Sequence, residues 1–331
     1  MNKLPYFRNG RFYNDEKDSV KSRLWHAAKV FLKSLPKYLL KKNNKKSVLA
    51  ELNGWKDLSN SLVDSIKSQD QFSVTWIGHS TFLIKLADTT ILTDPIFFNV
   101  SKFFPRYADA AFTIDKLPKI DFVLISHNHR DHFDLPSLRL IETRDKPTFL
   151  VPLGDAKLLK KNGFVNVFEK HWWDVHSCPK SMFEFTFLPA VHWTGRGPFD
   201  INKSLWGSWM LQMNGFKIYF AGDSAAGSHF CKIGKRFEGI DVALMPIGPC
   251  YPREFMAESH LDSHEAVQAF LDLGANHFIP MHWGTFKSGF ESVLHPIEVL
   301  QLLWLDKNEM LKGKMLSILK FGQTSIFDKK C

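Results

Sequence analysis

Residues 126–132, with the sequence SHNHRDH, directly follow an apolar run that is typical of a buried strand. Four of these residues can bind a metal ion, and they lie within six positions of one another. A hydrophobic core cannot satisfy all of them, because a buried polar side chain without a partner costs about 1–3 kcal/mol. The chain must therefore fold so that something occupies the space between them. Imidazole and carboxylate together suit a borderline divalent ion, zinc first, with iron or manganese behind it.

Three later residues repeat this arrangement of an apolar run followed at once by a possible ligand. His192, Asp223 and His282 each stand directly after a run with the pattern of a strand. Taken alone, any one of them would be interpreted as an ordinary core or loop residue. Because the ends of strands can converge on one pocket, the three residues together with the cluster predict a metal site.

The part of the chain from Phe72 onward predicts an α/β fold. Short apolar runs alternate there with Gly, Asp and His, and helical patterns fit between some of them. Strands and helices in this order favour two packed sheets covered by outer helices. The predicted strands are residues 72–80, 81–87, 89–95, 121–127, 148–152, 182–192, 208–213, 216–223, 241–248 and 277–282, and the predicted helices are 135–141, 155–161, 263–273 and 295–305.

The length of 331 residues predicts one catalytic domain, residues 71–331, preceded by an extension, residues 1–70. The formal net charge of +9 is carried by the extension. Residues 1–46 hold thirteen basic and three acidic residues, whereas the rest of the chain holds thirty basic and thirty-one acidic residues. A nuclease needs cations along its substrate groove, so we expect no nucleic-acid partner.

The cysteines and the apolar segments indicate where such a protein resides. Cys178, Cys231, Cys250 and Cys331 form no C-x-x-C pair, which predicts neither a disulfide framework nor a thiolate zinc site. The first residues lack the apolar core of a signal peptide, and no uninterrupted apolar stretch of about 18 residues occurs. We therefore expect a cytoplasmic protein without a transmembrane segment.

A basic amphipathic helix is predicted within residues 21–46. Apolar residues recur there at helical spacing opposite several lysines. Such a helix can lie on an anionic membrane surface, with Trp25 and Phe31 at the acyl boundary, or it can pack on its own domain with its lysines in solvent. The two interpretations carry equal weight, because both produce the same periodicity.

The H-x-H-x-D-H motif of residues 127–132 resembles the defining motif of the metallo-β-lactamase superfamily. The resemblance extends from about Phe72 to the end of the chain and implies a four-layered αββα sandwich with a two-metal site at the strand ends. It also implies two zinc ions with shared ligands. The family pattern assigns His127, His129 and His192 to one metal, Asp131, His132 and His282 to the other, and Asp223 to a position between them.

Several segments are similar to the N-acyl-phosphatidylethanolamine-hydrolysing phospholipase D branch of this superfamily. They include TWIGHSTFLIKL, HNHRDH, YFAGDS, MPIGPCYPREFM and MHWGTF, in the order of that branch. The resemblance implies a phospholipid substrate, attack of a metal-bridging hydroxide on phosphorus, and the products phosphatidic acid and N-acylethanolamine. It makes Asp131, Asp223 and His260 the expected catalytic residues, with His260 binding phosphate or donating a proton. His79 matches the family pattern, which leaves its role open, and we interpret it as a residue that orients a ligand.

Other functions remain open at this point. A branch of the ascorbate-phosphate lactonase type shares GHSTFLI and the metal pattern, so a lactonase or a soluble phosphodiesterase is the main alternative. A metal-binding module without catalysis is a third possibility, against which the intact ligand set argues. For a membrane-surface phospholipase, removal of residues 1–46 is expected to weaken liposome binding while leaving hydrolysis of a soluble phosphodiester largely intact.

Overall fold

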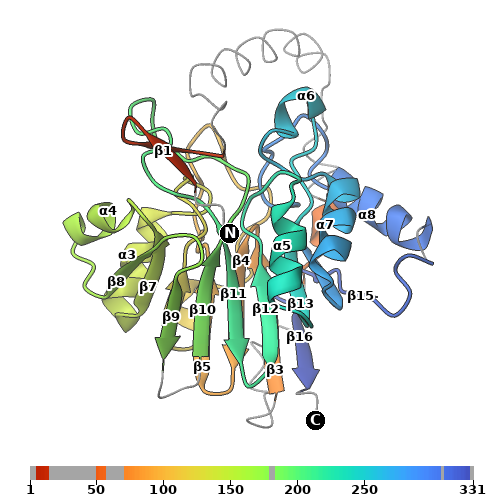
Figure 1. Cartoon of the computed structure of the whole chain (residues 1–331), viewed down its shortest axis with the longest axis horizontal. Coiled ribbons are helices and arrows are strands. Elements are labelled where there is room, and N and C mark those ends of the chain that lie inside the picture. The colour runs from red at the N-terminus through yellow and green to blue at the C-terminus, as the bar shows by residue number, and fades with distance from the viewer. Residues whose placement is uncertain (1–4, 15–49, 57–70, 179–182, 307–308, 329–331) are drawn as a thin grey trace.

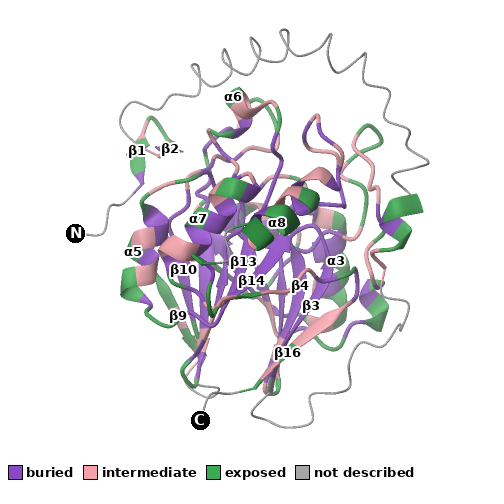
Figure 2. Cartoon of the chain, turned by 90° about the vertical axis from the view of Figure 1, so that its right-hand side faces the viewer, coloured by how far each residue is buried: buried purple, intermediate pink, exposed green. Residues whose placement is uncertain are grey.

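The computed structural model describes residues 5–14, 50–56, 71–178, 183–306 and 309–328. Two seven-stranded sheets pack face to face, and helices cover the outer side of each (Figures 1 and 2). This is the αββα sandwich expected from the sequence. The basic helix predicted for residues 21–46 lies outside the described residues.

The first sheet places two parallel strand ends where the metal-ligand cluster begins. Its strands lie in the order β16-β3-β4-β5-β6-β7-β8, antiparallel as far as β5 and parallel from β5 to β8. Since β5 and β6 are parallel, the residues that follow them lie at the same edge of the sheet. The strands are β3 (Gln71–Gly78), β4 (Thr81–Leu86), β5 (Thr89–Thr93), β6 (Phe122–Leu124), β7 (Thr148–Pro152), β8 (Val167–Lys170) and β16 (Thr324–Asp328), and the helical segments on this side are η1 (Ile114–Lys116), α3 (Leu135–Asp145) and α4 (Ala156–Lys161).

The second sheet brings three further strand ends to one edge. Its order is β15-β14-β13-β12-β11-β10-β9, with parallel pairs from β12 to β15 and antiparallel pairs from β9 to β12. Strands β10, β12 and β14 therefore run in the same direction. The strands are β9 (Val175–Cys178), β10 (Phe183–Leu188), β11 (Ser208–Met213), β12 (Phe216–Phe220), β13 (Val242–Pro246), β14 (His277–Met281) and β15 (Met315–Leu316), and the helices that follow them are α5 (His229–Arg236), α6 (Arg253–Met256), α7 (Ser263–Leu273) and α8 (His295–Asp306).

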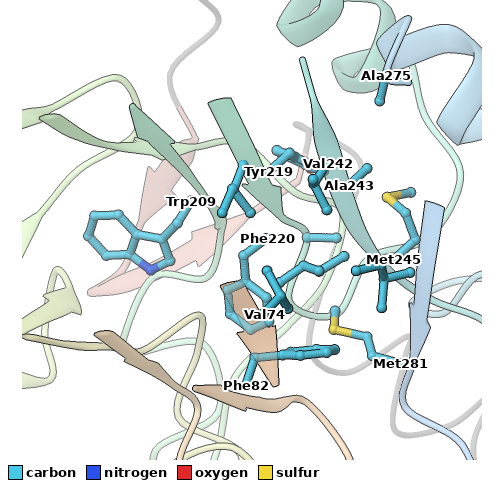
Figure 3. Close-up of a cluster of buried hydrophobic side chains, with 14 of the residues drawn as sticks. Val74, Phe82, Trp209, Tyr219, Phe220, Val242, Ala243, Met245, Ala275 and Met281 are labelled. Atoms are coloured by element: carbon cyan, nitrogen blue, oxygen red, sulfur yellow. The ribbon is translucent and has the colours of Figure 1, made fainter. Parts of the chain in front are cut away.

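A large apolar core fills the space between the sheets. Trp76 and Phe82 of the first sheet and Trp209 and Phe220 of the second are all completely buried, and Figure 3 shows several of these side chains meeting across the interface. Burial of aromatic side chains of this size dominates the free energy of such a core. The core holds the two sheets at a fixed separation, so the loops at the strand ends start from a rigid base.

Parts of the N-terminal segment also pack against the sandwich. Strands β1 (Tyr6–Arg8) and β2 (Arg11–Tyr13) form a hairpin near the metal-ligand edge (Figure 1). Further along the chain, Leu52 is buried in the core and the ring of Trp55 meets that of Trp283 edge-on, with centroids 5.0 Å apart. None of the helices in the described part of the chain is long and apolar enough to span a bilayer.

Candidate metal centre

The H-x-H-x-D-H motif forms the loop between β6 and α3. The loop turns back on itself because the amides of His132 and Phe133 both donate to the carbonyl of His129. Asp134 then caps α3 by accepting a hydrogen bond from the amide of Ser137 at 3.1 Å. This tight turn keeps all four possible ligands of the motif at the edge of the first sheet where β5 and β6 end.

The three later ligands come from the facing sheet. His192, Asp223 and His282 follow β10, β12 and β14, and all three side chains are buried. Gly222 permits the close approach of the two sheets: it has a φ of +58°, and an added Cβ would lie 2.5 Å from the Cβ of Ser126. A larger residue at this position would therefore push Asp223 away from the motif loop.

Three imidazoles form the first ligand group. The Nδ1 atom of His129 lies 2.9 Å from Nε2 of His127 and 3.2 Å from Nε2 of His192. In a tetrahedral site with metal–nitrogen bonds of about 2.1 Å, neighbouring ligand atoms are about 3.4 Å apart. The two measured separations are slightly shorter than this, and the three nitrogens lie close enough together that they could hold one metal ion.

Two imidazoles and a carboxylate form the second group. The Nε2 atoms of His132 and His282 are 3.3 Å apart. The Oδ2 atom of Asp131 lies 3.7 Å from the first of these nitrogens and 3.9 Å from the second. These atoms form a second cluster that could hold a metal ion.

Asp223 lies between the two groups. Its Oδ2 atom is 3.3 Å from Nε2 of His132 and 3.2 Å from Nε2 of His282. The same oxygen is 4.0 Å from Nε2 of His127 and 3.8 Å from Nε2 of His192. Among the described residues, its buried Oδ1 atom has no hydrogen-bond partner. A buried carboxylate in this position fits a ligand shared by two cations.

The electrostatics of the cluster also favour cations. Burial alone would raise the pKa of Asp223, but the imidazoles of His132 and His282 outweigh burial and hold this pKa well below its ordinary value. Burial and neighbouring imidazoles lower the pKa values of His127 and His192 far below 6.5. These two rings are therefore neutral at neutral pH, and a neutral imidazole is the form that binds metal.

A shell of hydrogen bonds orients the imidazoles. Asp94, which follows β5, accepts from Nδ1 of His132 at 2.8 Å and from the hydroxyl of Ser126 at 2.5 Å. The hydroxyl of Ser126 in turn accepts from Nδ1 of His127 at 2.9 Å, and the carbonyl of Ser259 accepts from Nδ1 of His192 at 2.8 Å. Each of these rings donates outward through Nδ1, which leaves the lone pair of Nε2 for the centre.

His79 contacts the second ligand group, and its own imidazole lies within that cluster of possible ligands. Its Nε2 atom lies 3.2 Å from Oδ2 of Asp131, and its carbonyl accepts from the amide of His282 at 3.2 Å. The φ angles of His79, His282 and Asp94 are 53°, 64° and 32°, in a region that non-glycine residues rarely adopt. Strain of this kind persists where the surrounding structure enforces it, which is common at functional sites.

His260 lies at the edge of the cluster, beside Asp223. Its Nδ1 atom is 3.5 Å from Oδ2 of Asp223, and its ring packs on that of His192 with centroids 5.1 Å apart. The loop between α6 and α7 holds it in place, since its carbonyl accepts from Arg253 at 2.8 Å. His260 is partly open to solvent, so it can contact a substrate that reaches the cluster.

Sequence reasoning missed several residues around the site. Asp94 escaped notice although it too stands directly after a strand, and the position alone was a usable signal. Asn128 lies inside the motif and joins two loops: it donates to Asp155 at 3.0 Å and accepts from the amide of Gly195 at 2.9 Å. Burial raises the pKa of Asp155 to about 7. No local pattern indicates these pairings, because they join distant segments.

The family model of the beta-lactamase superfamily domain matches residues 89–283, which contain every proposed ligand. The chain belongs to this superfamily. The match confirms the resemblance found in the sequence.

Superfamily relatives with assigned names include two phospholipases. One is the mitochondrial N-acyl-phosphatidylethanolamine-hydrolyzing phospholipase D of Saccharomyces cerevisiae, 37% identical over 69% of this chain and 51% of that protein. The other is N-acyl-phosphatidylethanolamine-hydrolyzing phospholipase D 1 of Caenorhabditis elegans, 32% identical over 80% of this chain and 78% of that protein. This chain thus spans about half the length of the yeast protein.

A solved structure supports the same fold. Igni18, a metallo hydrolase from Ignicoccus hospitalis, aligns with a TM-score of 0.61 and 22% identity over 78% of this chain and 100% of its own. The family match and the named relatives identify the chain as an enzyme. At 22% identity this neighbour shows the fold alone.

Proposed function

We propose that this protein is a dinuclear zinc phosphodiesterase that hydrolyses N-acyl-phosphatidylethanolamine-type phospholipids to phosphatidic acid and N-acylethanolamine. The observation that carries the proposal is the position of the Asp223 carboxylate between two groups of converging ligand atoms. The names of the yeast and nematode relatives supply the substrate class.

Zinc is the proposed ion because of the donor set. Imidazoles with a few carboxylates and no thiolate suit zinc, with iron or manganese as weaker candidates. A pair of such ions supplies a hydroxide nucleophile near neutral pH and neutralises charge on the phosphoryl oxygens. In the overall reaction, the oxygen of one water forms a bond to phosphorus, the bond from phosphorus to the ethanolamine oxygen breaks, and that oxygen takes up a proton.

His260 is the proposed phosphate-binding residue. Burial, as the largest cause, lowers its pKa to about 3, so its ring is neutral at pH 7 and carries one N–H. Such a ring donates a hydrogen bond to a phosphoryl oxygen without an added positive charge. Of the two roles expected from the sequence, phosphate binding therefore fits this environment better than proton donation.

The choice of substrate is tested by the products. Purified protein loaded with zinc is expected to convert a defined N-acyl-phosphatidylethanolamine into equal amounts of phosphatidic acid and N-acylethanolamine, measured by mass spectrometry. A panel of lactones and a soluble phosphodiester are assayed in parallel. Turnover of a lactone with no release of phosphatidic acid would replace the phospholipase proposal with the lactonase alternative.

Exposed aromatic side chains near the site favour a lipid substrate. Phe103 is 98% exposed and Phe199 is 83% exposed. The loop of Phe103 reaches the cluster through two ring contacts: Phe104 stacks on Phe286 with centroids 5.5 Å apart, and Phe286 meets His79 edge-on at 5.0 Å. Large apolar side chains in water beside an active site are typical of a surface that binds apolar molecules.

The loop of Phe199 is attached to the motif loop itself. Arg196 donates to the carbonyl of Asn128 at 3.1 Å and to that of Phe133 at 2.7 Å. Phe199 lies three residues further along the same loop. We propose that both exposed rings enter the surface of the bilayer that holds the substrate. Residues 21–46 remain a second proposed membrane contact.

Removal of these two rings is expected to separate vesicle binding from catalysis. The double variant Phe103→Ser with Phe199→Ser should bind phospholipid vesicles at least about 100-fold more weakly, since each buried phenyl ring contributes about 1.5–3 kcal/mol and the two together contribute about 3–6 kcal/mol. Hydrolysis of a soluble phosphodiester should stay within about twofold of wild type. Vesicle sedimentation and the soluble assay measure the two effects.

Leu305→Ser is the matched control, because Leu305 is 77% exposed on the outer helix α8. It should leave both measurements unchanged. Equal vesicle binding by the double variant and wild type would remove these rings from the membrane contact.

A further inference from the structure

An N-terminal hairpin reaches the metal centre from a distant part of the sequence. Strands β1 and β2 are joined by Asn9 and Gly10, whose φ angles are 51° and 71°. Asn-Gly with two positive φ angles is the strongest short signal for a two-residue hairpin turn. Asn14 is the residue directly after β2, so the hairpin determines its position.

The hairpin is anchored on the loop that follows His192. Phe12 and Tyr13 are buried, and the amide of Phe12 donates to the carbonyl of Asn202 at 2.8 Å. The guanidinium of Arg11 donates to the carbonyl of Ile201. Within the hairpin, the rings of Phe7 and Phe12 lie 4.8 Å apart. These contacts give Asn14 a rigid support.

The side chain of Asn14 binds the backbone of His192 at two points. Its Nδ2 atom donates to the carbonyl of His192 at 3.0 Å, and its Oδ1 atom accepts from the amide of His192 at 3.3 Å. His192 lies beyond the end of β10, outside the pairing of that strand with β9 and β11. The planar amide acts in place of a strand partner, because it offers a donor and an acceptor side by side.

The opposite side of this segment is also fixed. The amide of Val191 donates to the hydroxyl of Ser224 at 3.0 Å, and the carbonyl of Val191 accepts from the amide of Ala225 at 2.8 Å. The imidazole of His192 is held through Nδ1 by Ser259. Asn14 thus completes a set of contacts that aims Nε2 of His192 at the first ligand group.

We propose that Asn14 is a positioning residue for the first metal site, and that the N-terminal hairpin is part of the catalytic machinery. The proposal rests on the proposed function insofar as His192 binds a metal ion. It has a consequence for truncation: removal of residues 1–46 should lower hydrolysis of a soluble phosphodiester as well as liposome binding. The sequence alone suggested that only liposome binding would be affected.

The test measures zinc affinity by competition with a chromophoric chelator, together with the number of ions bound per chain at saturating zinc. Asn14→Ala is expected to weaken one of the two sites about 10- to 100-fold, the usual effect of removing a contact behind a ligand, and to leave the other unchanged. Asn14→Asp is expected to weaken the same site, because it keeps an acceptor for the amide of His192 but loses the donor to its carbonyl. Asn166→Ala is the control, since the exposed side chain of Asn166 also donates to a backbone carbonyl, that of Lys146, and lies before β8, at the sheet edge opposite to the ligand groups.

The outcomes distinguish the two proposals. Wild-type affinity at both sites in Asn14→Ala or in Asn14→Asp would overturn the positioning role while leaving the metal centre intact. Failure of the wild type to bind two ions would overturn the proposed function itself. A purely structural role for Asn14 would lower the melting temperature of the zinc-saturated protein without changing either affinity, and that result also counts against the proposal.

Discussion

Asp223→Ala is expected to reduce hydrolysis by at least about 10³-fold and to lower bound zinc from two ions per chain to one or none. The carboxylate lies within 4.0 Å of four imidazole nitrogens, two from each ligand group. Removing it takes a shared ligand from both groups at once. It also removes the negative charge that offsets cation repulsion in a buried space.

The measurement combines metal analysis of dialysed protein with turnover of a phospholipid and of a soluble phosphodiester. Asp88→Ala is the matched control, since Asp88 is exposed in the turn between β4 and β5. It should keep two ions and full activity. Circular dichroism of Asp223→Ala establishes that the fold is retained. Turnover close to wild type in a folded Asp223→Ala protein would contradict the shared-ligand account.

Asp94→Asn is expected to weaken zinc binding about 10- to 100-fold and to lower activity at limiting zinc by a similar factor. The carboxylate of Asp94 accepts from three donors, namely Nδ1 of His132 and both the amide and the hydroxyl of Ser126. An amide group has only one acceptor atom, so its NH₂ must face a donor. The ring of His132 then loses the acceptor that orients it. The hydroxyl of Ser126, which orients the ring of His127, loses its own acceptor as well.

The control for this prediction is Asp121→Asn. Asp121 accepts from the amide of Thr90 at 2.9 Å and contacts none of the proposed ligands. Zinc titration with competition by a chelator measures both variants. Affinity in Asp94→Asn equal to that of the control would show that the orientation of His132 does not depend on this carboxylate.

The strands and the convergence of the proposed ligands were predictable because their signals are local. All ten predicted strands and the four helices predicted after Phe72 are present in the described residues, whereas the helix predicted within residues 21–46 lies outside them. An apolar run followed by His or Asp predicts both a strand and a possible ligand just beyond the end of that strand, as at His192. These patterns need no knowledge of distant contacts, because each is set by the burial of one strand.

Other elements could not be predicted because long-range pairing decides them. Strand β16 pairs with β3, with Thr324 opposite Thr75, and the two residues are 249 positions apart. β9 and β15 are short edge strands whose sequences lack alternation. Such segments become strands only once a neighbouring sheet edge is in place.

The contact of Asn14 with the site depends on both a local signal and a long-range pairing. The Asn-Gly turn that starts its hairpin is a local signal, and it could have been recognised in the sequence. The destination of the hairpin is not local, because Asn14 meets His192 across 178 positions. A predicted extension therefore proves to contact a predicted ligand, which only the three-dimensional arrangement reveals.

The most direct test of the two-metal account is anomalous diffraction at the zinc edge from crystals of the zinc-loaded protein. We predict two peaks about 3.5–4 Å apart, one contacting His127, His129 and His192 and the other contacting Asp131, His132 and His282, with Asp223 in contact with both. An absence of peaks, or a single peak outside these side chains, would contradict the account.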